Sequence, residues 1–240
     1  MKVLVTGGAS GLGEGITRKI AQNLAYKVYF TYLNSHEKAD QIENEFSNTK
    51  GIRCDFKNQN DITNLCSRLK ELDIDVLVNN AYHGDFIKSY FHKTDLSDFS
   101  SSFNDNVLPT VELSQAAINV FRKKKFGKII TISSAALVNV VPLGASVYAA
   151  NKAYLEQLAK VWASENAKFN ITSNIISPAF MLTSFTKSVD ERLVEQIIDS
   201  HPLKKLLTVG EVADSVYFLI QATQQINGVN LIINAGSSLK

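Results

Sequence analysis

Short apolar segments alternate with longer amphipathic segments along almost the whole chain. The apolar segments predict strands at Val3–Thr6, Val28–Tyr32, Gly51–Cys54, Val76–Asn79, Ile129–Ser133, Thr172–Ile176 and Asn230–Ile233. Between them apolar residues recur with helical spacing, for example at Ile62, Leu65 and Leu69. This alternation predicts an α/β fold of the Rossmann type, with a doubly wound, mainly parallel seven-stranded sheet and helices on both faces.

The alternation is not interrupted by a linker, a low-complexity segment or an internal repeat, so residues 1–240 are expected to form a single domain. The longest irregular region runs from Pro178 to Pro202, and a short helix is predicted within it at Asp190–Asp199. Long connections late in an α/β domain are typical of substrate lids. We therefore expect a lid at about residues 179–203.

Composition narrows the class of protein. Hydrophobic residues make up 45% of the chain, charged residues 20%, and the net charge is only +2, which argues against nucleic acid as a partner. No apolar run approaches the ~20 residues of a membrane span, and the chain enters its first strand too early for a signal peptide. Two cysteines and four scattered histidines suggest neither a disulfide framework nor a metal site. These features predict a cytoplasmic protein.

A glycine-rich turn follows the first predicted strand. It reads Thr6-Gly7-Gly8-Ala9-Ser10-Gly11-Leu12-Gly13 and leads into a helix. Glycine lets the backbone turn tightly and approach a pyrophosphate, and a helix N-terminus offers free N–H groups to it. Such a turn can also be a plain strand-to-helix connection, but its position between the first strand and the first helix favours a nucleotide.

Four further segments accompany this loop in a fixed order. They are Asn79-Asn80-Ala81, Asn106, Ile132-Ser133-Ser134 and Tyr148-Ala149-Ala150-Asn151-Lys152. With the Thr-Gly-x-x-x-Gly-x-Gly loop they resemble the short-chain dehydrogenase/reductase family, and in particular its 3-oxoacyl-[acyl-carrier-protein] reductases. The resemblance covers essentially the whole chain and implies one NAD(P)-binding domain. The predicted cofactor-binding residues are Gly7, Ser10, Gly11, Leu12, Gly13, Tyr32, Asn34, Ser35, Asp55, Asn80, Ala81, Tyr148, Lys152, Pro178 and Thr183.

The end of the second strand bears on the choice of cofactor. NAD-specific sites usually place a carboxylate there for the ribose 2′-hydroxyl, but this chain has no acid before Glu37. Asn34, Ser35 and His36 can hydrogen-bond a 2′-phosphate, and Lys38 can add charge. No arginine is present there or at Ser10, which argues against NADP(H). The absence of an acid therefore favours NADP(H), and NAD(H) stays possible. Asp55 matches an adenine-binding position of the family, but it is equally compatible with a turn or cap.

The predicted catalytic group can be argued from chemistry. Reduction of a ketone needs a hydride at carbon and a proton at oxygen, and a tyrosine, whose pKa is about 10, needs a nearby cation to act near neutrality. Tyr148 and Lys152 are four residues apart and share a helix face. Ser134, at a strand end, would polarise the carbonyl. By resemblance, Asn106 would hold a water that links Lys152 to solvent.

Each of these residues has an ordinary structural alternative. Tyr148 alone can be a half-buried aromatic residue, Lys152 a solvated lysine, Ser134 a strand-end cap, and Asn106 a partner for a kinked backbone. Their occurrence together with the glycine loop favours the catalytic interpretation.

Three segments depart from the family pattern. Tyr82 stands where the family has the glycine of Asn-Asn-Ala-Gly, and Ala179 stands where it has the glycine of Pro-Gly. A usual Asp-Gly-Gly near the C-terminus reads Asn234-Ala235-Gly236. If position 179 needs a positive φ, alanine would be strained there.

The leading hypothesis is an NADPH-dependent reductase of 3-oxoacyl thioesters carried on an acyl carrier protein. The alternatives are a dehydrogenase or reductase of a sugar, polyol or other small alcohol, and a catalytically silent nucleotide-binding scaffold. Retention of Ser134, Tyr148 and Lys152 argues against the scaffold. A homo-oligomer, a tetramer or dimer, is expected from the resemblance and from the apolar helices around Val111–Phe121 and Tyr154–Trp162.

A basic run, Arg122–Lys125, closes the helix that carries Asn106. Cations at a helix C-terminus complement its dipole, so the run can be ordinary solvated surface. Carrier proteins are acidic, however, and the resembling reductases have basic residues here and near Lys168. The second hypothesis is that both positions flank the mouth of the active site and dock the carrier.

Overall fold

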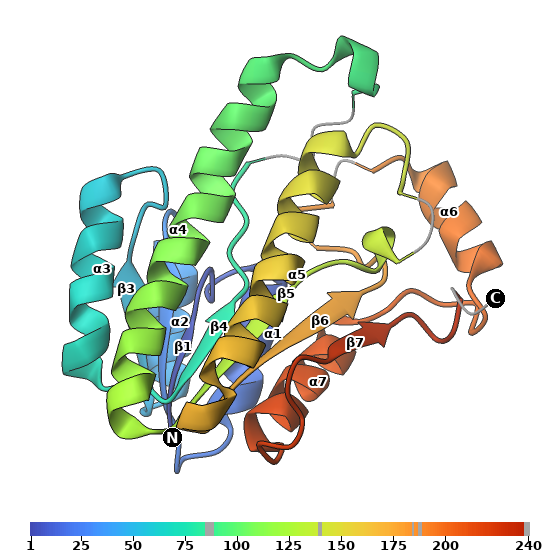
Figure 1. Cartoon of the computed structure of the whole chain (residues 1–240). Helices are drawn as coiled ribbons and strands as arrows, with labels where there is room; N and C mark the ends of the chain where they lie inside the picture. The colour runs from blue at the N-terminus through green and yellow to red at the C-terminus, as the bar shows by residue number, and fades with distance from the viewer. Residues whose placement is uncertain (85–88, 139–140, 184, 187–188, 238–240) are drawn as a thin grey trace.

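The computed structural model describes residues 1–84, 89–138, 141–183, 185–186 and 189–237. All seven predicted strands are present within a residue or two of their predicted positions, and they form one parallel sheet in the order β3-β2-β1-β4-β5-β6-β7 (Figure 1). The strands are β1 (Lys2–Val5), β2 (Lys27–Tyr32), β3 (Thr49–Arg53), β4 (Val76–Asn79), β5 (Gly127–Ile132), β6 (Ile171–Pro178) and β7 (Asn230–Ile233). The predicted fold class is confirmed.

Helices cover both faces of the sheet. Those described are α1 (Gly11–Ala21), α2 (His36–Glu45), α3 (Gln59–Leu72), α4 (Leu96–Lys124), α5 (Ser146–Asn166), α6 (Glu191–Ser200) and α7 (Val209–Gln221). In Figure 1, α3, α4 and α5 stand side by side on the near face, and α1, α2 and α7 lie on the far face. The helix predicted at residues 190–199 is α6, one residue further along.

The burial of the strands explains their apolar character. Successive residues of β5 enter different cores: Ile130 packs with Phe30 on the side of α1 and α7, and Ile129 packs with Phe121 on the side of α3, α4 and α5. A parallel strand buried on both faces needs apolar residues at successive positions, because neither face meets water. The short continuous apolar runs of the sequence are the direct consequence.

Chain reversal between β1 and β4 determines where a ligand can bind. The chain moves outward from β1 through β2 to β3, then returns to β4 on the other side of β1. The loops that leave the carboxyl ends of β1 and β4 therefore diverge, which opens a crevice at that edge of the sheet. The glycine loop follows β1, and Asn80 and Ala81 follow β4.

Of the two alanines that replace family glycines, Ala235 has a positive φ and Ala179 does not. Among the described residues, positive φ values outside glycine occur at Asp73, Lys125, Asn170, Lys204 and Ala235. Ala179 is not one of them; its N–H extends the sheet by donating to the Ile233 carbonyl at 2.9 Å. The left-handed alanine is Ala235, with φ 52°, where the family has glycine.

No helix in the described part of the chain combines the length and apolarity needed to cross a membrane.

Candidate active site

The glycine loop forms a tight cradle at the start of α1. Gly7 has φ 65° and donates its N–H to the Thr31 hydroxyl at 2.9 Å. A Cβ on Gly13 would lie 2.1 Å from the Gly7 carbonyl oxygen and 2.5 Å from the Asn80 amide nitrogen, so no side chain fits there. Ser10 precedes the helix without a side-chain capping bond. The first N–H groups of α1 are thus available to a phosphate, and the loop fits the pyrophosphate of a dinucleotide.

The loops after β1 and β4 are locked together by one threonine. The Thr6 hydroxyl accepts the N–H groups of Asn80 at 2.9 Å and Ala81 at 3.0 Å, and it donates to the Val78 carbonyl. The Asn80 amide in turn donates to the Thr6 carbonyl at 2.9 Å. Both walls of the crevice therefore have a fixed spacing, which a dinucleotide bound between them requires.

The residues predicted to choose the cofactor surround the start of α2. The imidazole of His36 meets the Tyr32 ring edge-on at 5.3 Å between centroids, and Asn34 is exposed. Lys38 forms an ion pair with Glu14 of α1 at 3.0 Å. A phosphate here would therefore compete with Glu14 for the lysine.

Two other predicted cofactor residues make bonds within their own segments. The Asp55 carboxylate accepts the N–H of Lys57 at 2.9 Å, which is a turn interaction. Thr183, in the predicted lid, donates its N–H to the Thr186 hydroxyl at 2.9 Å. Residues 184, 187 and 188 of the lid lie outside the described residues. Pro178 ends β6 at the same edge of the sheet as the glycine loop.

Three of the four predicted catalytic residues lie together. Tyr148 and Lys152 occupy the first turns of α5, and Ser134 lies two residues after the end of β5. The Ser134 side chain is hydrogen-bonded to Tyr148. The Lys152 ammonium, 5% exposed, donates to the Ile132 carbonyl at 2.8 Å. The lysine is thus tied to the same strand end that carries the serine.

Asn106 is a clamp on the loop after β4. Its carboxamide oxygen accepts the N–H of His83 at 2.5 Å, and its nitrogen donates to the His83 carbonyl at 3.2 Å and to the Ser102 carbonyl at 3.0 Å. The backbone carbonyl of Asn106 accepts the Thr110 hydroxyl at 2.8 Å. The buried amide therefore fixes backbone beside the site, and the predicted water-holding role remains a prediction.

Burial shifts the pKa values of Tyr148 and Lys152 in opposite directions. Burial raises the pKa of Tyr148 to about 12, although its hydrogen bond with Ser134 opposes the rise. Burial lowers the pKa of Lys152 to about 8. The protein groups alone therefore do not lower the tyrosine pKa, and a lowering by the ammonium together with the charge of an oxidised nicotinamide stays a prediction. The ammonium lies over the Tyr148 ring, 5.9 Å from its centroid, and burial has the larger effect on the hydroxyl.

Glu156 is a site residue that the sequence interpretation missed. Its carboxylate accepts the hydroxyls of Ser133 at 2.6 Å and Ser177 at 3.3 Å and the Asn230 amide at 3.5 Å, and so ties α5 to the ends of β5 and β6 and to the start of β7. Its charge also raises the pKa of Lys152 against the effect of burial. The available signal was its position four residues after Lys152, on the same helix face.

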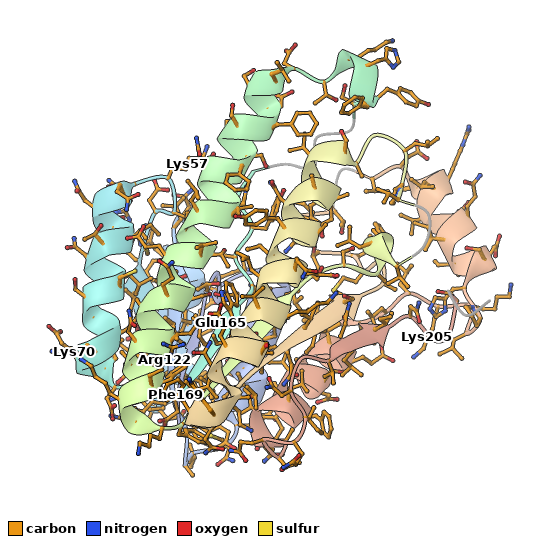
Figure 2. All side chains as sticks on the ribbon, viewed as in Figure 1. Lys57, Lys70, Arg122, Glu165, Phe169 and Lys205 are labelled. Carbon is orange, nitrogen blue, oxygen red and sulfur yellow. The ribbon has the colours of Figure 1, made fainter. Side chains whose placement is uncertain are left out.

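The basic run does not flank this site in a single chain. It closes α4, whereas Tyr148 opens α5, and α4 and α5 both run away from the site toward the lower end in Figure 2. At 1.5 Å per residue, the 21 residues of α5 span about 30 Å and the 29 residues of α4 about 44 Å. At that lower end Arg122 lies over the Phe169 ring, and Lys124 pairs with Asp75 at 2.5 Å. Within one chain, Arg122–Lys125 and Lys168 therefore do not flank the mouth, and the carrier-docking role stays a prediction.

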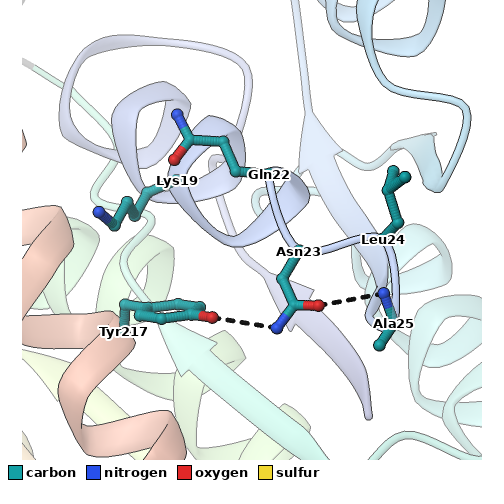
Figure 3. Close-up of a pocket in the computed structure, with 6 residues that line it drawn as sticks. All are labelled: Lys19, Gln22, Asn23, Leu24, Ala25 and Tyr217. Atoms are coloured by element: carbon teal, nitrogen blue, oxygen red, sulfur yellow. Dashed lines mark hydrogen bonds between the residues drawn. The ribbon is translucent and has the colours of Figure 1, made fainter.

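A surface hollow elsewhere lies away from the glycine loop, although a lysine and a tyrosine line it. It is lined by Lys19, Gln22, Asn23, Leu24, Ala25 and Tyr217 (Figure 3). The Asn23 amide donates to the Tyr217 hydroxyl at 3.0 Å. The hollow lies where α1 ends and so at the opposite edge of the sheet from the glycine loop. No cluster of His, Cys, Asp or Glu that could hold a metal occurs within the described ranges.

Nicotinamide-dependent oxidoreductases combine a dinucleotide cradle of this kind with nearby acid–base groups, and the fold and the site place the chain in that class. A family model described as enoyl-(acyl carrier protein) reductase, of the short-chain alcohol dehydrogenase type, matches residues 7–238. The chain therefore belongs to the short-chain dehydrogenase/reductase family. It is an NAD(P)-dependent oxidoreductase.

Relatives with several activities resemble it over almost their whole length. The 3-oxoacyl-[acyl-carrier-protein] reductase MabA of Mycobacterium tuberculosis is 28% identical, with 99% of this chain and 92% of the relative covered. Carbonyl reductase family member 4 of Xenopus laevis is 30% identical, with 98% and 97% covered. A solved structure assigned as an NAD(P)-dependent gluconate 5-dehydrogenase of Beutenbergia cavernae, with NADP at low occupancy, has a TM-score of 0.90 and 23% identity, covering 100% and 97%.

Proposed function

We propose that the chain is an NADPH-dependent reductase that converts 3-oxoacyl thioesters, carried on an acyl carrier protein, into the corresponding secondary alcohols. The arrangement of Ser134, Tyr148 and Lys152 beside the glycine loop carries this proposal. When bound, the nicotinamide supplies the hydride. Tyr148 donates the proton to the carbonyl oxygen, Ser134 orients that oxygen by a hydrogen bond, and Lys152 stabilises the tyrosinate that results.

Two observations support an acyl substrate. Several relatives are 3-oxoacyl-[acyl-carrier-protein] reductases at 28–29% identity. The lid contributes an apolar side chain beside Tyr148, because the Phe185 ring lies 5.9 Å from the tyrosine ring. A sugar or polyol would need a polar partner at that position. The second candidate function is a sugar or polyol dehydrogenase. The likeness to the gluconate 5-dehydrogenase structure supports it through the fold alone.

A substrate panel tests the proposal. NADPH oxidation is followed with 3-oxoacyl thioesters on carrier protein, their short soluble analogues, keto-sugars and simple ketones. A kcat/KM for the 3-oxoacyl thioesters at least tenfold above the other classes would support it. Turnover restricted to keto-sugars would favour the sugar dehydrogenase, and NADPH binding without turnover of any carbonyl would favour the scaffold.

We expect Tyr32→Asp to reduce the preference for NADPH over NADH roughly tenfold or more, because a carboxylate beside a 2′-phosphate adds like-charge repulsion on the order of 1–4 kcal/mol. Tyr32 ends β2 beside His36. Dissociation constants of both cofactors, from their fluorescence, give the preference. Tyr32→Asn is the matched control, since it removes the same ring without adding charge. Selective binding of NADH by the unmodified protein would refute the NADPH assignment.

We also propose a homo-oligomer, a tetramer or dimer, in the cytoplasm. Leu108 of α4 and Tyr154 and Val161 of α5 are exposed apolar side chains on adjacent helices. Covering such a face is a common reason for self-association. Light scattering at micromolar concentration should give a multiple of the 26.5 kDa chain mass, and a value near that mass itself would contradict the proposal.

A further inference from the structure

Tyr82 fills the centre of the site in place of the glycine of related sequences. Its ring meets the Tyr148 ring edge-on, with 5.2 Å between centroids, and the Phe185 ring at 5.7 Å. The Lys152 ammonium lies over the same ring, 5.0 Å from its centroid. One aromatic side chain therefore contacts both residues of the predicted proton-transfer pair, and it lies nearer to the ammonium than the Tyr148 ring does.

The far end of Tyr82 is held by two helices. Its hydroxyl lies 3.4 Å from the Ser102 hydroxyl of α4 and accepts the Asn151 amide of α5, also at 3.4 Å. The Asn151 amide donates to the Ser102 hydroxyl at 2.9 Å as well. The hydroxyl thus belongs to a small polar network between α4 and α5, and the network determines how deep the ring sits.

The backbone at Tyr82 is fixed from both sides. Ala81 is bonded to the Thr6 hydroxyl, and the N–H and C=O of His83 are both bonded to the Asn106 carboxamide. A ring on a backbone held in this way cannot shift without breaking buried hydrogen bonds. The buried amide of Asn106 is therefore placed to act through Tyr82.

We infer that Tyr82 is a positioning residue, which holds the Lys152 ammonium against its ring face and the Tyr148 ring against its edge in the arrangement needed for proton transfer. This inference rests on the proposed function, since it assigns Tyr82 a task within the same site. The negative face of an aromatic ring attracts a cation, most strongly where water is excluded. Lys152 is buried and so meets that condition.

The surroundings of Lys152 leave few other groups to stabilise its charge. From α5 it faces Tyr148 and the Glu156 carboxylate, whose effect on its pKa is smaller than that of burial. Toward β5 it donates a hydrogen bond to the Ile132 carbonyl. The contribution of the Tyr82 ring should therefore be measurable in the ionisation of the lysine itself.

The test measures that ionisation directly. Protein labelled with [ε-13C]lysine is titrated by NMR, and the Lys152 signal is assigned as the one missing from Lys152→Met. Tyr82→Leu should move the titration midpoint of Lys152 down by about 0.5–1.5 pH units, because the charged form loses the ring face. Tyr82→Phe is the matched control, since it keeps the ring and should leave the midpoint nearly unchanged. If Tyr82→Leu does not fold, Tyr82→Gly serves instead, because glycine is the residue of the family pattern.

Two results would overturn the inference. One is a Lys152 midpoint that stays the same in both Tyr82→Leu and Tyr82→Gly. The other is tighter NADPH binding and a higher kcat in Tyr82→Gly, since the ring would then be an obstacle. The titration needs neither cofactor nor substrate. A protein that reduces none of the carbonyl compounds would refute the proposed function and still give a clear answer about Tyr82.

Discussion

Replacing Tyr148 with Phe should lower kcat for carbonyl reduction by about 10²–10⁴-fold while leaving the NADPH dissociation constant within about twofold of its original value. Phe keeps the ring that packs against Tyr82 and Phe185. It removes only the hydroxyl, which is hydrogen-bonded to Ser134. Initial rates at saturating NADPH, together with cofactor fluorescence titration, separate the two effects.

Tyr154→Phe is the matched control for this prediction. Tyr154 lies on the same helix, is 47% exposed, and packs its ring on Phe103. Loss of its hydroxyl should leave both constants unchanged. If Tyr148→Phe retained more than about a tenth of the original kcat, another group would have to donate the proton, because general-acid catalysis normally contributes at least 10²-fold.

The fold could be predicted because its signals are local. A strand buried on both faces must be apolar at successive positions, and the seven runs show this directly. The order of the strands also follows from local rules, since right-handed crossovers leave few ways to arrange strand–helix units. The ends of the strands depend also on pairing with neighbours. The strand predicted to stop at Ile176 continues to Pro178, because β7 still pairs with it there.

The site was predictable where its chemistry needs a fixed spacing along one element. Tyr148 and Lys152 share a helix turn, so the sequence alone brings them together. The contribution of Thr31, whose hydroxyl accepts the Gly7 N–H, was not predictable, because it depends on strand pairing between residues far apart in sequence. The direction of the Tyr148 pKa shift also depends on burial, which sequence spacing does not reveal.

The location of the basic run could not be predicted. Its charge and the resemblance to carrier-dependent reductases suggested a docking surface near Tyr148, but distance along a helix decides its location within one chain. The long helix α4 begins near the site and ends at the other edge of the sheet, where Lys124 binds Asp75 and the Asp73 carbonyl. These bonds stabilise the start of β4 and give the lysine an adequate structural role.

The second large effect concerns Lys152. Lys152→Met should lower kcat by about 10²–10⁴-fold and weaken NADPH binding roughly 10–100-fold, since a charged hydrogen bond contributes about 1.5–3 kcal/mol. Met has a similar length and keeps the buried stem packed, so the fold should survive. Unlike Tyr148→Phe, this change should affect both constants, because we expect the ammonium to bond the nicotinamide ribose as well as to stabilise the tyrosinate.

The pH dependence of NADPH binding provides an independent measurement of the same group. Burial lowers the pKa of Lys152 to about 8, so the ammonium is present below that pH and is lost as the pH rises through it. NADPH affinity of the unmodified protein should therefore fall as the pH is raised from 7 to about 9.5, a range over which the charge is removed. In Lys152→Met the affinity should be weak and flat over the same range. Lys160→Met, on an exposed position of the same helix, should keep both the affinity and its pH dependence. A pH dependence that persisted in Lys152→Met would assign the titration to another group and remove Lys152 from the cofactor site.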